Sequence, residues 1–295
     1  MKKRMLGSIY LIIAVLIWGS TFVAQSVGMD KIGPFTFQTS RCVLAILFLI
    51  PAIALFEAHD LGNYFRKWLQ KDLWIAGVQC GLALFAAASL QQVSLVNTDA
   101  GRAGFLTALY VIFVPIIGLV LGKKLQLNVA ISIDLSVVGL YLLSGAGLEG
   151  MQSGDIMLLG SAFCFAIQIT LIEKWGNQVD GLRLNCIQCL VTAVLSAIFM
   201  IFTETPQTQA VLDCWLPIGY AGVLSMGVAY SLQVLGQQRL DSTPATIIMS
   251  TESVIAAICG WLILHEIMST KEVLGCCLVF TAVILSQISF PKKRT

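Results

Sequence analysis

The chain has 295 residues, of which 57% are hydrophobic and only 12% are charged, and its net charge is +2. An ordinary soluble domain has about 25% charged residues, so this composition excludes a soluble protein built around one large core. The small net charge and the absence of a basic stripe argue against a nucleic-acid partner. The mean hydropathy is +0.86, and the apolar residues form runs of about 20, the length of a helix that spans a lipid bilayer.

Hydropathy predicts ten membrane-spanning helices and no other domain. A basic start, Lys2 to Arg4, precedes the first apolar run. It is similar to a signal peptide, but the run continues to about Val27 without an A-x-A site, so we expect a retained span. The only longer connection, Glu57–Lys71, is amphipathic and is expected at the membrane interface. The predicted spans are Leu6–Val27, Phe35–Phe56, Asp72–Val93, Ala100–Leu121, Asn128–Ala146, Gly154–Glu173, Leu184–Phe202, Trp215–Gly236, Pro244–Leu264 and Val273–Phe290.

Lysine and arginine predict the orientation, because cytoplasmic segments are enriched in them. With both termini in the cytoplasm of a cell (cytoplasmic) membrane, the predicted outer segments hold only Lys31, Lys271 and Arg102, and Arg41 lies within a span. All the remaining lysines and arginines then lie on the cytoplasmic side, namely Lys2, Lys3, Arg4, Arg66, Lys67, Lys71, Lys123, Lys124, Lys174, Arg183, Arg239, Lys292, Lys293 and Arg294.

An internal repeat divides the spans into two sets of five. At an offset of 142 residues Gly118 matches Gly260, and at an offset of 147 Cys42 matches Cys189. Each half has an odd number of spans, so the two halves must be inverted relative to each other, as in many transporters. The fold class predicted is an all-α integral membrane protein of ten transmembrane helices in two inverted five-helix repeats. Residues 1–147 form the first repeat, 154–290 the second and 291–295 a basic cytoplasmic tail.

Several segments resemble the drug/metabolite transporter superfamily, in particular its ten-helix EamA-type permeases. The resemblance lies in IWGSTFVA at Ile17–Ala24, AGRAGFLTALYVIFVPIIGLVLGKK at Ala100–Lys124 and TESVIAAICGWLILHE at Thr251–Glu266. Glu252, Gly260, Trp261 and Glu266 match the family pattern, whereas Ser253 stands where the family usually has proline. This departure weighs against a kink of the family type in the ninth span. The resemblance implies a transporter of small metabolites, without naming the substrate.

Charged residues inside spans are candidate site residues, because burying a charge in a membrane is costly. Arg41 can grip a carboxylate or phosphate, although a structural ion pair or snorkelling would also explain it. Glu252 can bind an ammonium group, carry a coupled proton, pair with Arg41 or only pack between helices. Asp134 is a second candidate for proton coupling, but it more readily faces Lys123 or Lys124. Arg102 is expected to pair with Asp99.

Uncharged residues supply further candidates. Gln168 and Gln188 occupy repeat positions equivalent to Thr21 and Arg41, so they are predicted to line the same cavity. Amides inside membranes also bond neighbouring helices together, and aromatic side chains often only pack. The remaining substrate-site candidates are Trp18, Thr21, Tyr110 and Tyr230.

Other motifs indicate packing. Gly77/Gly81 and Gly118/Gly122 form GxxxG pairs, which let helices approach closely. Most of the nine cysteines lie in apolar runs and behave as small hydrophobic residues. Cys186 and Cys189 form a CxxC pair, but on a membrane helix that lacks the context of a redox site.

We therefore expect a secondary transporter that moves a small polar metabolite, in the first place an amino acid or related zwitterion, by alternating access, and the family resemblance favours export. Arg41 would hold its anionic group and Glu252 its cationic group or a proton. Other metabolites or drugs (a nucleoside, vitamin or organic cation) and a non-transporting sensor or scaffold are the alternatives. No catalytic motif, metal site or cofactor site is recognised, and no Walker motif indicates ATP. A homodimer is left open.

Overall fold

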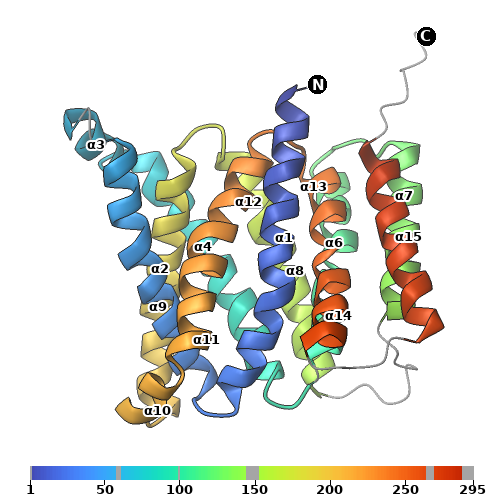
Figure 1. The fold of residues 1–295 in the computed structure, drawn as a ribbon. Helices are drawn as coiled ribbons and strands as arrows, with labels where there is room; N and C mark the ends of the chain where they lie inside the picture. Colours follow the sequence, from blue (N-terminus) through green and yellow to red (C-terminus); the bar gives the residue numbers. More distant parts are fainter. Residues whose placement is uncertain (1, 58–60, 99, 144–152, 264–268, 288–295) are drawn as a thin grey trace.

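The computed structural model describes residues 2–57, 61–98, 100–143, 153–263 and 269–287, and within these ranges it contains helices and no strand. Eight helical segments are long and apolar enough to cross a membrane, and two shorter apolar helices, 127–142 and 273–286, complete the predicted ten. The spans lie roughly side by side as a bundle, with Lys2 and Gln287 at the same end (Figure 1). We call this the N-terminal end.

The elements follow the predicted spans closely. Spans four, eight and nine are each divided into consecutive helical pieces, and α3 and α10 are short connecting helices. The bounds are α1 Lys2–Met29, α2 Pro34–Phe56, α3 Leu61–Trp68, α4 Lys71–Ser94, α5 Ala100–Ala108, α6 Tyr110–Val120, α7 Leu127–Leu143, α8 Ser153–Trp175, α9 Gly181–Thr203, α10 Thr208–Asp213, α11 Trp215–Gly219, the π-helix η1 Tyr220–Ala229, α12 Tyr230–Gln237, α13 Ser242–Met249, α14 Glu252–Ile263 and α15 Thr270–Gln287.

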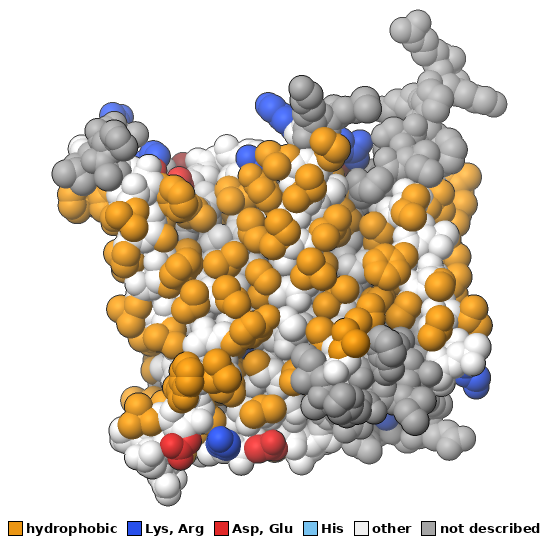
Figure 2. Space-filling model, viewed as in Figure 1, with side chains coloured by type: hydrophobic (Ala, Val, Ile, Leu, Met, Phe, Trp, Pro, Cys, Tyr) orange, Lys and Arg blue, Asp and Glu red, His pale blue; other side chains and the backbone are white. Residues whose placement is uncertain are grey.

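On the face seen in Figure 2, hydrophobic side chains cover the middle of the bundle and charged side chains gather at its two ends. Large hydrophobic side chains are exposed along the outer faces, for example Leu47, Val194 and Ile284 at 62%, 52% and 66% exposure. A soluble protein rarely leaves so much contiguous apolar surface uncovered. This apolar surface is the one that faces lipid in a multi-pass membrane protein.

The repeat is visible in the helix ends themselves. Adding 147 to the bounds of α2, Pro34–Phe56, gives Gly181–Thr203, the bounds of α9. The two helices run antiparallel side by side. Each is followed at its C-cap by a glutamate, Glu57 after α2 and Glu204 after α9, and these two glutamates are repeat equivalents.

These two glutamates join α2 and α9 at both ends. Glu204 accepts hydrogen bonds from the backbone N–H groups of Phe35 and Thr36, each at 2.8 Å, and so caps the start of α2 from another helix. Glu57 accepts two hydrogen bonds from Arg183 near the start of α9, at 3.1 and 2.6 Å. Thr36 and Arg183 are themselves repeat equivalents. We call these contacts the two end clamps.

The clamp at the N-terminal end is built around a fully buried cation. The Arg183 side chain is 0% exposed, and its guanidinium lies 5.2 and 5.3 Å from the ring centres of Tyr64 and Trp68. Asp180 lies 3.4 Å away and Lys67 also contacts Glu57. The amphipathic helix α3 is thereby held against the ends of α2 and α9, which confirms that the loop after span two carries an amphipathic segment.

The two GxxxG pairs have different roles. A Cβ atom at Gly77 or Gly81 would lie 2.4 or 2.6 Å from a side-chain atom of Ile187 or Val191, so this pair lets α4 pack tightly on α9. Gly118 has no such neighbour, and Gly122 has φ +81° at the end of α6. The backbone N–H of Lys123 donates to the carbonyl of Gly118, which is the pattern of a glycine helix cap. The expectation of close packing at Gly118/Gly122 is therefore wrong.

The first prediction concerns the buried clamp. Glu57→Ala leaves the buried Arg183 charge with Asp180, at 3.4 Å, as its remaining carboxylate partner among the described residues, beside the carbonyl oxygen of Tyr64, and breaking a buried pair typically costs about 3–5 kcal/mol. Because Glu57 is 21% exposed, we expect the lower part of that range, measured by thermal unfolding in detergent. The double variant Glu57→Leu/Arg183→Met removes both charges and should recover much of the loss. Equal destabilisation of the single and double variants would contradict this assignment.

The same clamp predicts a pH dependence. The Arg183 hydrogen bonds lower the pKa of Glu57 to about 2, whereas an unfolded glutamate has a pKa of about 4.3. A lowered folded-state pKa contributes stability that is complete above the unfolded pKa and is lost as the pH falls through the folded one. The stability difference between the wild type and Glu57→Gln should therefore be constant above about pH 5 and vanish towards about pH 2. A difference that persists at that pH would contradict the prediction.

The third prediction separates the glycine pairs. Gly81→Ala places a Cβ 2.6 Å from Val191 and 3.2 Å from the backbone of Gln188, and such overpacking costs about 1–3 kcal/mol. Gly118→Ala is the matched control, because its nearest neighbour would lie at 3.6 Å. We expect a lower thermal unfolding midpoint for the first variant and an unchanged or higher one for the second. The reverse order would show that α4 and α9 do not pack as described.

Candidate functional site: a charged pocket between the repeats

Two interrupted helices meet in the middle of the bundle. Span four is broken at Leu109, between α5 and α6, and span nine at Ser250 and Thr251, between α13 and α14. The breaks are repeat equivalents, because Leu109 plus 142 is Thr251. Ser250 and Thr251 donate their hydroxyl groups to the carbonyls of Ile247 and Ile248 at 2.8 and 2.7 Å. Such side-chain bonds to the backbone compete with the hydrogen bonds of a regular helix. Span nine is therefore interrupted, although it lacks the proline that the EamA-type pattern usually has.

Ser253 links the two interrupted spans. Its hydroxyl group donates to the carbonyl oxygen of Gly104 in α5 at 2.8 Å. Residues Tyr110 and Glu252, the first residues after the two breaks, also meet: the Tyr110 hydroxyl donates to Glu252 Oε1 at 2.9 Å. Residues that are equivalent in two repeats can touch only close to the axis that relates the repeats. The Tyr110–Glu252 bond therefore marks the centre of the molecule.

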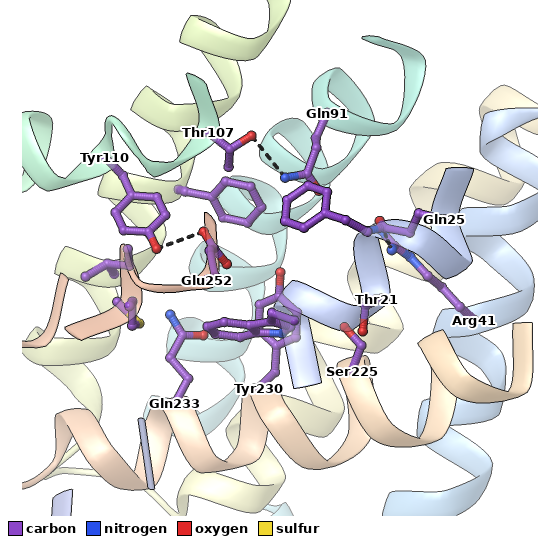
Figure 3. A pocket seen from close by; sticks show the side chains of 15 residues that line it. Thr21, Gln25, Arg41, Gln91, Thr107, Tyr110, Ser225, Tyr230, Gln233 and Glu252 are labelled. Carbon is purple, nitrogen blue, oxygen red and sulfur yellow. Dashed lines mark hydrogen bonds between the residues drawn. The ribbon is translucent and has the colours of Figure 1, made fainter. Parts of the chain in front are cut away.

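A pocket lies around this centre, and both repeats supply its walls (Figure 3). The empty space within the pocket, including the part open to solvent, is about 520 Å³. Apolar walls come from Phe22, Phe165, Ile169 and Met249. The lining residues with polar atoms are Trp18, Thr21, Gln25, Arg41, Gln91, Thr107, Tyr110, Ser225, Tyr230, Gln233 and Glu252.

Arg41 gives one side of the pocket a positive charge. It is 3% exposed, and its guanidinium donates to the side-chain oxygens of Gln25, at 2.5 Å, and Gln38. Both partners are neutral, and within the described residues no carboxylate forms an ion pair with Arg41. Its Nε–H is buried without a partner. A buried cation compensated only by amides is suited to receive an anionic group.

Glu252 supplies an acidic group on another side of the pocket. It is 6% exposed and is the first residue of α14, where a helix N-terminus favours negative charge. In Figure 3 Arg41 and Gln25 lie towards one side of the pocket, and Glu252, Tyr110 and Gln233 towards the other. The pocket therefore separates a cationic end from an acidic end.

Two further polar atoms of the lining have no hydrogen-bond partner. They are Trp18 Nε1, a donor, and Gln233 Oε1, an acceptor. The Trp18 ring packs edge to face on Tyr230 with centres 5.0 Å apart. An unpaired buried polar atom costs about 1–3 kcal/mol, and a bound ligand with the complementary group removes that cost.

The predicted site residues are only partly brought together. Arg41, Glu252, Trp18, Thr21, Tyr110 and Tyr230 all line the pocket. Gln168 and Gln188 are fully buried behind its wall, where they bond to each other at 3.2 Å, so the prediction that they line the cavity is not met. Asp134 is exposed on α7 and does not line the pocket. Lys123 pairs with Glu173 rather than with Asp134.

Other predictions concern residues that do not line the pocket. Arg102 forms a two-bond ion pair with Asp155, at 2.7 and 2.6 Å, a partner that the sequence did not indicate, and its expected partner Asp99 is not among the described residues. Glu266 also lies outside the described residues. The Cys186–Cys189 pair is buried and unbridged on α9, which agrees with a packing role.

Sequence reasoning missed five polar lining residues, namely Gln25, Gln91, Thr107, Ser225 and Gln233. One could have been found from helix periodicity, because Gln25 follows Trp18 and Thr21 by seven and four residues and so shares their helix face. Gln91 and Gln233 are repeat equivalents. Nothing in the local sequence distinguishes Thr107 or Ser225 from a packing residue.

Comparison with known proteins agrees with this architecture. The model of the EamA-like transporter family matches residues 5–145 and 152–287. An uncharacterized transporter of Archaeoglobus fulgidus is 32% identical over 286 residues, which cover 96% of this chain and 86% of that one. The threonine/homoserine exporter RhtA of Escherichia coli is 27% identical over 167 residues, about half of each chain (54% of both). A solved crystal structure with 18% identity has a TM-score of 0.77 over 95% of this chain and 96% of that one. Because two copies of the family model together span almost the whole chain, this protein belongs to the EamA-like transporter family.

Proposed function

We propose that this transporter carries a small amino acid or a related zwitterion across the cytoplasmic membrane by alternating access. The observation that carries the proposal is the separation of opposite charges within one pocket, Arg41 with neutral partners on one side and Glu252 on the other. A free amino acid presents the complementary carboxylate and ammonium. The relatives named as threonine/homoserine exporters support this class of substrate and the outward direction.

The orientation proposed places both termini in the cytoplasm. Lys67, Lys71, Lys123, Lys174 and Arg239 all lie near helix ends at the N-terminal end of the bundle. The opposite end holds Lys31, Arg102 and Lys271 among the described residues. Such an asymmetry follows the positive-inside rule.

The inverted repeats support alternating access, because the two halves can exchange conformations around a central site. If a proton is coupled to transport, Glu252 is favoured over Asp134, since it lies in the pocket. The charged pocket also favours a zwitterion over a simple organic cation, which would meet the unneutralised charge of Arg41. A homodimer is compatible with this mechanism, and the pocket is formed within one chain.

The fourth prediction tests the two charges. In vesicles loaded with L-threonine, Arg41→Ala and Glu252→Gln should each lower efflux about 10–100-fold, because each removes a charge-assisted contact worth about 1.5–3 kcal/mol. The matched controls are Arg102→Ala and Glu173→Gln, whose ion pairs lie outside the pocket. They should retain most of the flux if the variants remain folded.

The outcome divides the alternatives. Full flux in both pocket variants would contradict the site. If wild-type vesicles transport none of the common amino acids while nucleosides, vitamins or organic cations move, the substrate class is wrong. Binding without any flux would instead indicate a sensor. Flux that ignores an imposed pH gradient would exclude proton coupling at Glu252.

A further inference from the structure

Behind the pocket, four buried side-chain amides form a continuous row. Gln233 Nε2 donates to Gln168 Oε1 at 3.2 Å, and Gln168 Nε2 donates to Gln188 Oε1 at 3.2 Å. Gln188 Nε2 then donates to Asn185 Oδ1 at 2.8 Å. All four are at most 2% exposed, and they come from α12, α8 and α9. We call them the amide row.

The far end of the row is fixed by backbone carbonyls. Asn185 Nδ2 lies 2.9 Å from the carbonyl oxygen of Met226 and 3.1 Å from that of Gly227. Carbonyl oxygens only accept hydrogen bonds. The side chain of Asn185 must therefore turn its NH₂ group towards them, since the flipped amide would place three acceptors together.

A π-helix explains why these carbonyls are available. At the end of η1 the backbone N–H of Tyr230 donates to the carbonyl oxygen of Ser225, five residues earlier. The following segment, α12, is an α-helix, in which each N–H donates to the carbonyl four residues earlier. Such a change of spacing disturbs the regular backbone pairing of the carbonyls at this step, and π-helical turns are frequent at functional sites. Asn185 Nδ2 donates to two of these carbonyls, those of Met226 and Gly227.

The direction set at Asn185 passes along the whole row. Asn185 offers its oxygen to Gln188, so Gln188 must turn its NH₂ group to Asn185 and its oxygen to Gln168. The same step orients Gln168 and then Gln233. Gln233 is left with its oxygen as the free end of the row. That oxygen is buried without a partner, and Gln233 lines the pocket.

We propose that Gln233 Oε1 and Glu252 together form the ammonium subsite of the pocket, and that the amide row is the device that keeps the Gln233 oxygen turned towards the ligand. Gln233 is a ligand-contacting residue, whereas Gln168, Gln188 and Asn185 are positioning residues. This inference rests on the proposed function, because it needs a substrate that carries an ammonium group.

The other half of the molecule supports this division of roles. Arg41 and Gln38 are the repeat equivalents of Gln188 and Asn185, and in both pairs the later residue donates to the side-chain oxygen three positions earlier. The first repeat thus presents a hydrogen-bond donor without a partner to the pocket, the Nε–H of Arg41. The second repeat presents an acceptor without a partner, Gln233 Oε1. A ligand with a carboxylate at one end and an ammonium at the other satisfies both.

The fifth prediction uses three probes on purified protein. They are L-threonine, 3-hydroxybutanoate, which lacks the ammonium, and L-threonine methyl ester, which lacks the carboxylate charge. Gln233→Leu and Gln168→Leu should each weaken L-threonine and its methyl ester about ten-fold, the effect of one lost hydrogen bond to a charged group. Binding of 3-hydroxybutanoate should stay unchanged. Titration calorimetry measures all three affinities.

Two comparisons keep the experiment decisive. Gln92→Leu is the matched control, because Gln92 is a fully buried amide of α4 that neither lines the pocket nor bonds within the row. It should leave all three affinities unchanged. Gln168→Leu leaves Gln233 in place, so its selective effect on ammonium-bearing probes would show orientation through the row. If Gln233→Leu does not fold, Gln233→Asn, which is too short to reach, replaces it.

The results separate the two levels of inference. Equal weakening of all three probes, or no weakening of any, overturns the ammonium subsite. If the wild type does not bind L-threonine, the variants are titrated with whichever of the twenty common amino acids it binds, together with its deaminated analogue. If the wild type binds none of them, the proposed function fails and the subsite with it.

Discussion

The hydrogen bond between Tyr110 and Glu252 is the contact on which the arrangement of the site depends. These two residues are equivalent in the repeats, so their contact requires the two interrupted spans to cross at the axis between the halves. Both interruptions lie directly before them, at Leu109 and at Ser250–Thr251. Irregular backbone at this depth is tolerated only where it is buried in protein or lines a cavity. Here it does both.

The repeat fold is symmetric, but its chemistry is not. The first repeat places Arg41 at a position where the second has Gln188, and the second places Glu252 where the first has Tyr110. If charges of the same sign stood at equivalent positions of the two repeats near the axis, they would repel one another at close range. Dividing the charges between the repeats avoids this repulsion and gives the pocket two unlike ends. A symmetric scaffold thereby presents a pocket with two chemically different ends.

Much of this architecture could be predicted from the sequence, because membrane spans and their repeat depend on composition over long stretches. The ten spans, the offset of 147 between α2 and α9 and the lining role of Arg41 and Glu252 all follow from hydropathy and buried charge. Individual partners could not be predicted in this way. Arg102 pairs with Asp155, 53 residues away in the chain, and Gln168 lies behind the pocket wall. Both outcomes depend on which face of each helix turns inward, and hydropathy does not specify that face.

The interruption of span nine illustrates a second limit. Proline is the usual cause of a bend in a membrane helix, and Ser253 stands where the family usually has proline. The structure obtains the interruption from hydroxyl groups that bond local carbonyls at Ser250 and Thr251. Serine and threonine occur throughout membrane helices without breaking them, so their presence alone does not predict this effect.

The two end clamps restrict how α2 and α9 can move relative to each other. Sliding one helix along the other would stretch the contacts of Glu57 and Glu204 at the same time, and splaying either end would break one of them. Rotation of the pair as one rigid strut leaves both intact. The strut also carries Arg41 and the Asn185–Gln188 half of the amide row. Gln233 and Glu252, at the other end of the pocket, lie on α12 and α14, so any motion that tilts the strut against those helices changes the spacing between the cationic end and the acidic end of the pocket.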